Sequence, residues 1–198
     1  MATEYATLDD LKAQMGIEAD DTTRDALLTK ALKSASRGLE RATGRRFWLD
    51  ASATTRTYRL EARIVRERDG DVLLVDDIGD VTGMVVESGS GSSWTALTGY
   101  ETTPDNALAD GYAITGLLKP HGIWGTTSTR IRITAKFGWP AVPDDIAQAA
   151  LIQASRLFKR KDSPEGVMGS AEWGVVRLSR RDPDVWNLIE PYILPGFG

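Results

Sequence analysis

The stretch RIRITAKFGWPAVPDDIAQAALIQASRLFK, residues 130–159, changes from one hydrophobic period to another around a Trp-Pro step. Its first eight residues alternate as in a half-buried β-strand, which places four apolar residues on one face: Ile131, Ile133, Ala135 and Phe137. After Pro143 the apolar residues recur at three- and four-residue spacing, which predicts a helix with one apolar stripe: Ile146, Ala150, Ala154 and Leu157. A strand that runs directly into an amphipathic helix indicates an α+β protein.

Two further helices are predicted near the N-terminus. Thr7 and Asp10 have the spacing of a capping box, and Gly16 is placed to end the short helix between them. A second helix is predicted to begin near residues 21–23 and to end at Gly44, with a narrow face of apolar and small residues: Leu28, Leu32, Ala35, Leu39 and Ala42. Because small residues let another helix approach closely, we expect this helix to pack against the alanine-rich helix from the other end of the chain.

Between these helices the hydrophobic period is two. The runs TRTYRL, DVLLVDD and GMVVES read as short strands, and turn residues separate them at Asp69-Gly70, Gly83, residues 89–91 and Asp110-Gly111. We therefore predict an α+β fold with three parts. Residues 1–53 and 139–161 form a small helical bundle, residues 54–138 an inserted antiparallel β region, and residues 162–198 an extended C-terminal interface arm with a short helix.

The arm is predicted from the segment KRKDSPEGVMGSAEWG, residues 159–174. Three cations suit the negative end of the preceding helix, and Pro164 with Gly166 is expected to end that helix. Asp182-Pro183 then starts a helix that Pro191 stops. A helix of two turns is not stable alone, so its apolar residues must dock either on the chain's own core or on a neighbouring protein: Val185, Trp186, Leu188 and Ile189.

Composition excludes several classes of protein. The chain has 198 residues, no cysteine and one histidine, which excludes a disulfide scaffold, a zinc-thiolate site and a cysteine nucleophile. The N-terminus lacks the pattern of a signal peptide, and no run approaches the ~20 apolar residues of a membrane span. We expect a soluble protein made in the cytoplasm, without membrane contact.

Charge is distributed unevenly along the chain. The formal net charge of −4 argues against a general nucleic-acid binder, because such proteins neutralise phosphates with a basic surface. Residues 156–181 contain seven cations and three anions, a net +4, so the remainder carries −8. This basic segment is either a solvated surface or a contact for an acidic partner.

Patterns that suggest catalysis have simpler explanations. Residues 89–94 contain two glycines but lie between β-type runs, which predicts a hairpin turn and not a phosphate loop. His121 stands beside proline and glycine, as a loop residue does, and no nucleophile motif accompanies it. A cluster of carboxylates lacks the spacing of a calcium loop and suits turns and strand edges: Asp69, Asp71, Asp76, Asp77 and Asp80. Three tryptophans, Trp94, Trp124 and Trp139, are expected to anchor a core or an interface. We predict no catalytic, cofactor or metal site.

Five segments in order resemble one known family. They are YATLDDLKAQMGI and DALLTKALKSASRGLERATGRRF near the N-terminus, FGWPAVPDDIAQAALIQASRLFKRKDSPEGVMG after the β region, and then WGVVRLSRRDPDV and PYILP. Together they cover about half of the chain. They resemble the gp6-like head-tail connector (adaptor), or head-completion, proteins of tailed bacteriophages.

The resemblance implies a structural virion protein without an active site. Such a protein forms a ring, usually of twelve subunits, beneath the portal in the neck of the virion. The ring extends the DNA channel, lets genomic DNA pass without sequence-specific binding, and offers a platform to a downstream stopper or tail-completion protein. The alternatives are another joining protein, such as a stopper or tail terminator, or a DNA-binding protein.

On this reading the interface residues are expected at the end of the last long helix and in the arm. The candidates are Lys159, Arg160, Lys161, Trp173, Val175, Arg177, Arg180, Arg181, Trp186, Tyr192 and Ile193. Trp173 is expected to act as an anchor, because buried aromatic residues contribute much of the binding energy at interfaces.

Overall fold

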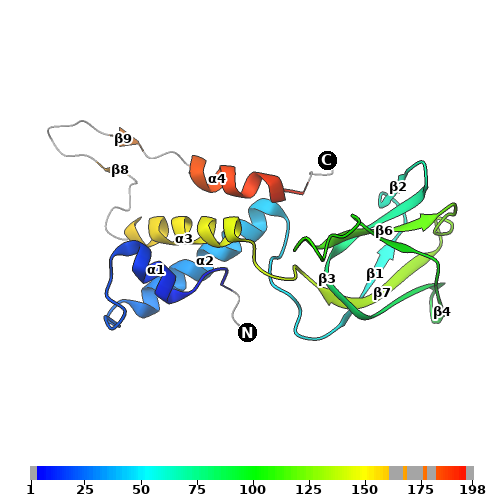
Figure 1. The fold of residues 1–198 in the computed structure, drawn as a ribbon, viewed down its shortest axis with the longest axis horizontal. Helices are drawn as coiled ribbons and strands as arrows, with labels where there is room; N and C mark the ends of the chain where they lie inside the picture. The colour runs from blue at the N-terminus through cyan, green and yellow to red at the C-terminus, as the bar shows by residue number, and fades with distance from the viewer. Residues whose placement is uncertain (1–3, 161–166, 169–175, 178–181, 195–198) are drawn as a thin grey trace. The chain divides into compact units, whose positions relative to one another are not determined.

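The computed structural model describes residues 4–160, 167–168, 176–177 and 182–194, with only the backbone described at 167–168 and 176–177. It divides into two compact units. Unit 1 consists of residues 1–45 and 142–198, and unit 2 of residues 46–141. Helices make up most of unit 1 and strands most of unit 2, so the prediction of an α+β protein with an antiparallel β region is confirmed (Figure 1).

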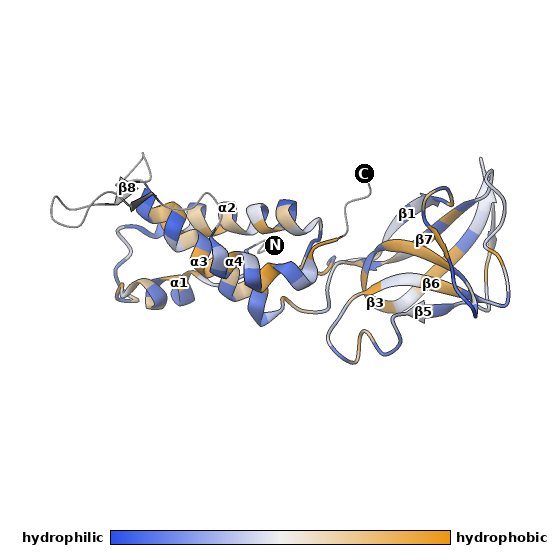
Figure 2. Ribbon diagram, turned by 90° about the horizontal axis from the view of Figure 1, so that it is seen from above, coloured by the Kyte–Doolittle hydropathy of each residue, from blue (hydrophilic) through white to orange (hydrophobic). Residues whose placement is uncertain are grey.

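Unit 1 contains the helices α1 (Leu8–Met15), α2 (Asp25–Thr43), α3 (Asp144–Lys159) and α4 (Pro183–Ile189), followed by the 3-10 turn η2 (Glu190–Tyr192). The helices α2 and α3 pack against each other, α1 contacts both, and α4 packs on α3. Figure 2 shows hydrophobic and hydrophilic residues along each of the longer helices, as expected of helices with one buried face. Two short strands, β8 (Val167–Met168) and β9 (Val176–Arg177), pair antiparallel between α3 and α4.

Both predicted ends of α1 and the predicted start of α4 are confirmed, whereas Pro191 lies within the 3-10 turn η2 that follows α4. The Thr7 hydroxyl accepts the Asp10 N–H at 3.1 Å while the Asp10 carboxylate accepts from the Thr7 N–H, and Gly16 ends α1 in the left-handed region at φ 67°. At α4 the Asp182 carboxylate accepts from the N–H groups of Asp184 and Val185, and Pro183 occupies the first turn. Helix α2 starts at Asp25, slightly later than predicted, and ends at Gly44 as predicted.

Unit 2 is built from seven strands in one antiparallel sheet. They are β1 (Thr54–Arg59), β2 (Ile64–Arg66), β3 (Gly70–Ser90), β4 (Ser93–Ala96), β5 (Glu101–Thr103), β6 (Ile114–Pro120) and β7 (Arg130–Phe137). The main path runs β1-β7-β3-β6-β5, while β2 and β4 each pair with β3. The alternation predicted for 130–137 is confirmed, since the four apolar residues of β7 are fully buried.

One prediction about the strands is wrong. Residues 71–77 and 83–88 read as two short strands, but β3 is a single strand of 21 residues. Its first half pairs with β6 and its second half with β7, with irregular register between Leu74 and Val85. At this bend the Asp80 carboxylate accepts the Thr82 N–H at 2.8 Å and Gly83 adopts φ 70°, so the chain changes direction without leaving the sheet.

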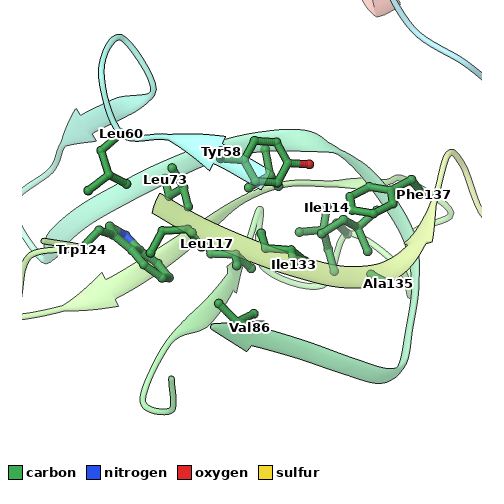
Figure 3. Close-up of a cluster of buried hydrophobic side chains, with 14 residues drawn as sticks. Tyr58, Leu60, Leu73, Val86, Ile114, Leu117, Trp124, Ile133, Ala135 and Phe137 are labelled. Carbon is green, nitrogen blue, oxygen red and sulfur yellow. The ribbon is translucent and has the colours of Figure 1, made fainter. Parts of the chain in front are cut away.

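The core of unit 2 lies inside the curved sheet. Tyr58, Leu73, Leu117, Ile133 and Phe137 are among the buried side chains that meet there (Figure 3). The chain enters and leaves unit 2 beside this core. The Asp50 N–H donates to the Phe137 carbonyl at 2.8 Å, and the buried rings of Phe47 and Trp139 lie 5.2 Å apart.

Candidate assembly surfaces

Five of the eleven residues predicted to form an interface have described side chains. Lys159 and Arg160 are exposed at the end of α3, and Trp186, Tyr192 and Ile193 are half-buried in α4 and the turn after it. For Arg177 only the backbone is described, in β9. The other candidates lie outside the described residues: Lys161, Trp173, Val175, Arg180 and Arg181.

Helix α4 docks on the bundle of its own chain. Val185 and Ile189 are buried, and an ion pair of 2.7 Å between Arg156 and Asp182 links α3 to the start of α4. The sequence left open whether these apolar residues dock on the chain's own core or on a neighbouring protein. In the structure, Val185 and Ile189 dock on the chain's own core.

The turn after α4 is hydrogen-bonded to residues at the ends of α2 and α3. The Tyr192 carbonyl accepts from Arg45 Nε at 2.9 Å, and the Tyr192 hydroxyl donates to the Asp145 carboxylate at 3.3 Å. The Leu194 N–H donates to the Thr43 carbonyl at 2.9 Å. These bonds connect residues 192–194 to the C-terminal end of α2 and the N-terminal end of α3.

A groove opens between α2 and α3 at the end of unit 1 where α2 begins and α3 ends. It has a volume of about 220 Å³ and is lined by Leu27, Lys30, Ala31, Ser34, Leu157 and Phe158. Leu27 is 50% exposed, although it belongs to a helix whose next residue, Leu28, is fully buried. This groove was not predicted, because the apolar stripe expected for α2 runs through Leu28 and Leu32. The spacing of Leu27 and Ala31, four residues apart, is the signal in the sequence that could have indicated it.

Lys12, in contrast to the exposed Leu27, is a charged residue that is buried inside unit 1. Its ammonium lies 2.7 Å from the Asp25 carboxylate and donates to the Ala19 carbonyl at 3.1 Å, and its side chain is 3% exposed. This pair joins α1, the following loop and the start of α2. No local pattern predicts this pair, because Lys12 and Asp25 are thirteen residues apart in the sequence.

Three of the five carboxylates considered as a metal site have partners within unit 2. Asp76 pairs with Arg56 at 2.7 Å, Asp80 pairs with Lys136 at 2.9 Å, and Asp77 accepts the Trp139 indole N–H at 3.0 Å. Hydrogen bonds from Thr82 and the ammonium of Lys136 lower the pKa of Asp80 to about 2. Among the described residues, no group of three or more His, Asp or Glu side chains is arranged to hold a metal ion.

The outer face of the sheet carries further charge pairs. Arg132 donates to Glu87 at 2.7 Å and stacks over the Trp94 ring at 4.4 Å, and this hydrogen bond lowers the pKa of Glu87.

Trp124 and Trp139 are buried, as expected of core anchors. His121 is an exposed loop residue whose N–H donates to the Asp69 carbonyl. The hairpin predicted at residues 89–94 is confirmed by the pairing of Gly89 with Trp94.

Across the described ranges, none of the helices is long and apolar enough to span a bilayer.

Comparison with known proteins gives a family match over about a third of the chain. Residues 5–73 match the family model described as phage gp6-like head-tail connector protein, a range that begins at Tyr5 and ends inside β3. A search among curated proteins gave no match.

Two solved structures share the fold. A chain from the neck of an empty gene transfer agent particle, computed with C6 symmetry, is 20% identical with a TM-score of 0.57. A chain from the virion of a native gene transfer agent particle is 20% identical with a TM-score of 0.54. Each comparison covers 100% of this chain and 95% of the other. At this identity the likeness concerns the fold. The family match over residues 5–73 confirms, for that part of the chain, the resemblance to gp6-like head-tail connector proteins that was predicted from the sequence.

Proposed function

We propose that this chain is a head-tail connector, or adaptor, in the neck of a tailed-phage-like particle. It forms a ring beneath the portal, extends the DNA channel, and offers a docking platform to the next stopper or tail-completion protein. The observation that supports this most strongly is the match of residues 5–73 to the connector family. The similarity of the full chain to a chain from the neck of a gene transfer agent particle agrees with it.

We propose a ring of twelve subunits with heterologous contacts, in which two different surfaces of each copy meet. Genomic DNA passes through the ring without sequence-specific binding, in keeping with the net charge of −4. Residues 162–198 are proposed as the interface arm. Because Val185 and Ile189 already dock on the chain's own bundle, the part of the arm that reaches a neighbour or the portal lies before α4.

Electron microscopy of reconstituted particles tests the function. Purified protein is mixed with portal-bearing particles of the same virus, and the region below the portal is averaged. We expect an added ring of density. Particles that bind no added protein at saturating concentration would remove the proposal.

A single substitution tests the arm in the same assay. Trp173→Ala is expected to lower the occupancy of the added ring while leaving the circular dichroism spectrum and unfolding midpoint unchanged. An equal occupancy for the variant and the parent protein would show that Trp173 is not an anchor. The ring itself could still form in that case, so the two results are separable.

A further inference from the structure

Unit 1 presents two surfaces of opposite charge that its own fold leaves exposed. The basic groove is formed by Leu27, Lys30, Ala31, Ser34, Leu157 and Phe158, with the exposed Lys159 and Arg160 directly following. The acidic edge is formed by α1 and the loop that follows it, and contains Asp9, Asp10, Glu18, Asp20 and Asp21. Each surface combines charge with apolar groups.

The basic groove has an apolar floor and exposed cations beside it. Its floor contains Leu27, which is 50% exposed, beside Ala31 and the side chains of Leu157 and Phe158. Within the described part of the chain, Lys30 makes no ion pair, and the same is true of Lys159 and Arg160. An apolar hollow beside exposed cations suits a partner segment that brings carboxylates and an aliphatic group together.

The acidic edge has the complementary composition. Its five carboxylates are exposed except for the half-buried Asp21. Lys12 and Arg24 are the only cations in residues 4–24, and Lys12 is buried against Asp25, so it does not neutralise the edge. Three half-buried aliphatic side chains lie among the carboxylates: Leu8, Met15 and Ile17.

We propose that the acidic edge of one copy seats in the basic groove of the next copy. Both surfaces belong to unit 1, and neither covers the other within one copy, because Leu27, Lys30 and four of the five edge carboxylates are exposed. A contact between two different surfaces is heterologous, and its repetition closes into a ring when the rotation between copies divides the circle. This inference rests on the proposed connector function and assigns the two faces of the contact between its subunits.

Thiol cross-linking tests the contact, because the chain contains no cysteine. The variant Ser34→Cys/Ala19→Cys places one thiol in the groove and one on the acidic edge, at two exposed small residues. It is treated with a short bis-maleimide across a concentration series, both free and bound to portal particles. The matched control Ser34→Cys/Ser92→Cys keeps the groove thiol and moves the second thiol to an exposed turn of unit 2.

We expect the 34/19 variant to give a ladder of dimers, trimers and larger products, while the 34/92 control stays largely monomeric. Adding Lys30→Glu to the 34/19 variant is expected to reduce cross-linked product about tenfold, because carboxylates would then face carboxylates. If rings form on portal particles and the 34/19 pair gives no ladder, the subunit contact lies elsewhere and the connector function stands. If neither rings nor cross-links form under any of these conditions, the proposed contact and the connector function are both wrong.

Discussion

Lys12 and Asp25 form an ion pair of 2.7 Å in which the two partners are unequally buried: the lysine side chain is 3% exposed and the aspartate 29%. Removal of one partner from a buried pair leaves the other charge uncompensated. The loss should therefore be larger when the lysine is the charge left behind.

We predict that Asp25→Ala lowers the free energy of unfolding by about 3 kcal/mol, and Lys12→Met by less than half of that. Urea unfolding followed by circular dichroism at 222 nm measures both. Lys30→Met, at an exposed position on α2, is the matched control and should change stability by less than about 0.5 kcal/mol. Equal losses for the two pair variants would contradict the assignment of Lys12 as the more buried charge.

A second prediction concerns pH and Asp80. The pKa of this carboxyl is lowered from 3.8 to about 2 by hydrogen bonds from Thr82 and by Lys136. A carboxyl whose pKa is lower in the folded state stabilises the fold fully above its unfolded pKa, and this contribution is lost as the pH falls toward the folded pKa.

The stability difference between the parent protein and Asp80→Asn should accordingly be constant above about pH 5 and shrink between pH 4 and pH 2. Asparagine can still accept the Thr82 N–H, so the difference reports the charge. Denaturant unfolding at a series of pH values checks this. A difference that stays unchanged down to pH 2 would contradict it.

Two glycines with positive φ provide a matched pair in unit 2. A Cβ atom at Gly138, where φ is 112°, would lie 2.0 Å from the Trp48 carbonyl oxygen. A Cβ atom at Gly83, where φ is 70°, would meet nothing within 4 Å. Gly83→Ala therefore incurs only the conformational cost of a left-handed residue, about 1–2 kcal/mol.

We predict that Gly138→Ala destabilises unit 2 clearly more than Gly83→Ala, because the backbone on both sides must move. Tryptophan fluorescence during urea unfolding gives the comparison, with Gly91→Ala as a further exposed control at positive φ. The prediction fails if the two alanine variants unfold at the same denaturant concentration.

The docking of α4 leads to the fourth prediction. Ile189 is 2% exposed in unit 1, so Ile189→Ala should reduce the stability of this unit by about 2–4 kcal/mol. It should also speed hydrogen exchange of the amides in α4, since a helix of seven residues depends on its tertiary contacts.

Asn187→Ala, at an exposed position of the same helix, is the control and should leave exchange nearly unchanged. Hydrogen exchange followed by mass spectrometry on the full chain measures the exchange rate of the α4 amides in both variants. Rapid exchange throughout α4 in the parent protein would mean that the helix is not held by Val185 and Ile189.

Local rules were enough to predict several parts of the fold. The alternation in β7 and the caps at Thr7 and Asp182 depend on residues a few positions apart, and each appears in the structure. The stripe predicted for α3 is correct for Ile146, Ala150 and Ala154, whereas Phe158 is buried in place of Leu157. The continuous β3 could not be predicted this way. Gly83 reads as the end of a strand, and only pairing with two different neighbours keeps the chain in the sheet.

The candidate surfaces depend even more on contacts between distant residues. The groove exists because Leu157 and Phe158 of α3 meet Leu27 and Ala31 of α2, about 130 residues earlier. Similarly, Lys12 reads in the sequence as a surface cation, and only the fold of the loop after α1 brings Asp25 next to it. The fold class was thus accessible from local patterns, while the surfaces that unit 1 leaves exposed needed the tertiary structure.

The bond between the Asp50 N–H and the Phe137 carbonyl has a consequence for how this protein can vary. The segments that begin and end unit 2 are hydrogen-bonded to each other, and the rings of Phe47 and Trp139 are in contact beside this bond. The residues between these contacts, 51–136, form the rest of the β region. We therefore expect loops within residues 51–136 to tolerate changes of length with little effect on the packing of α2 against α3.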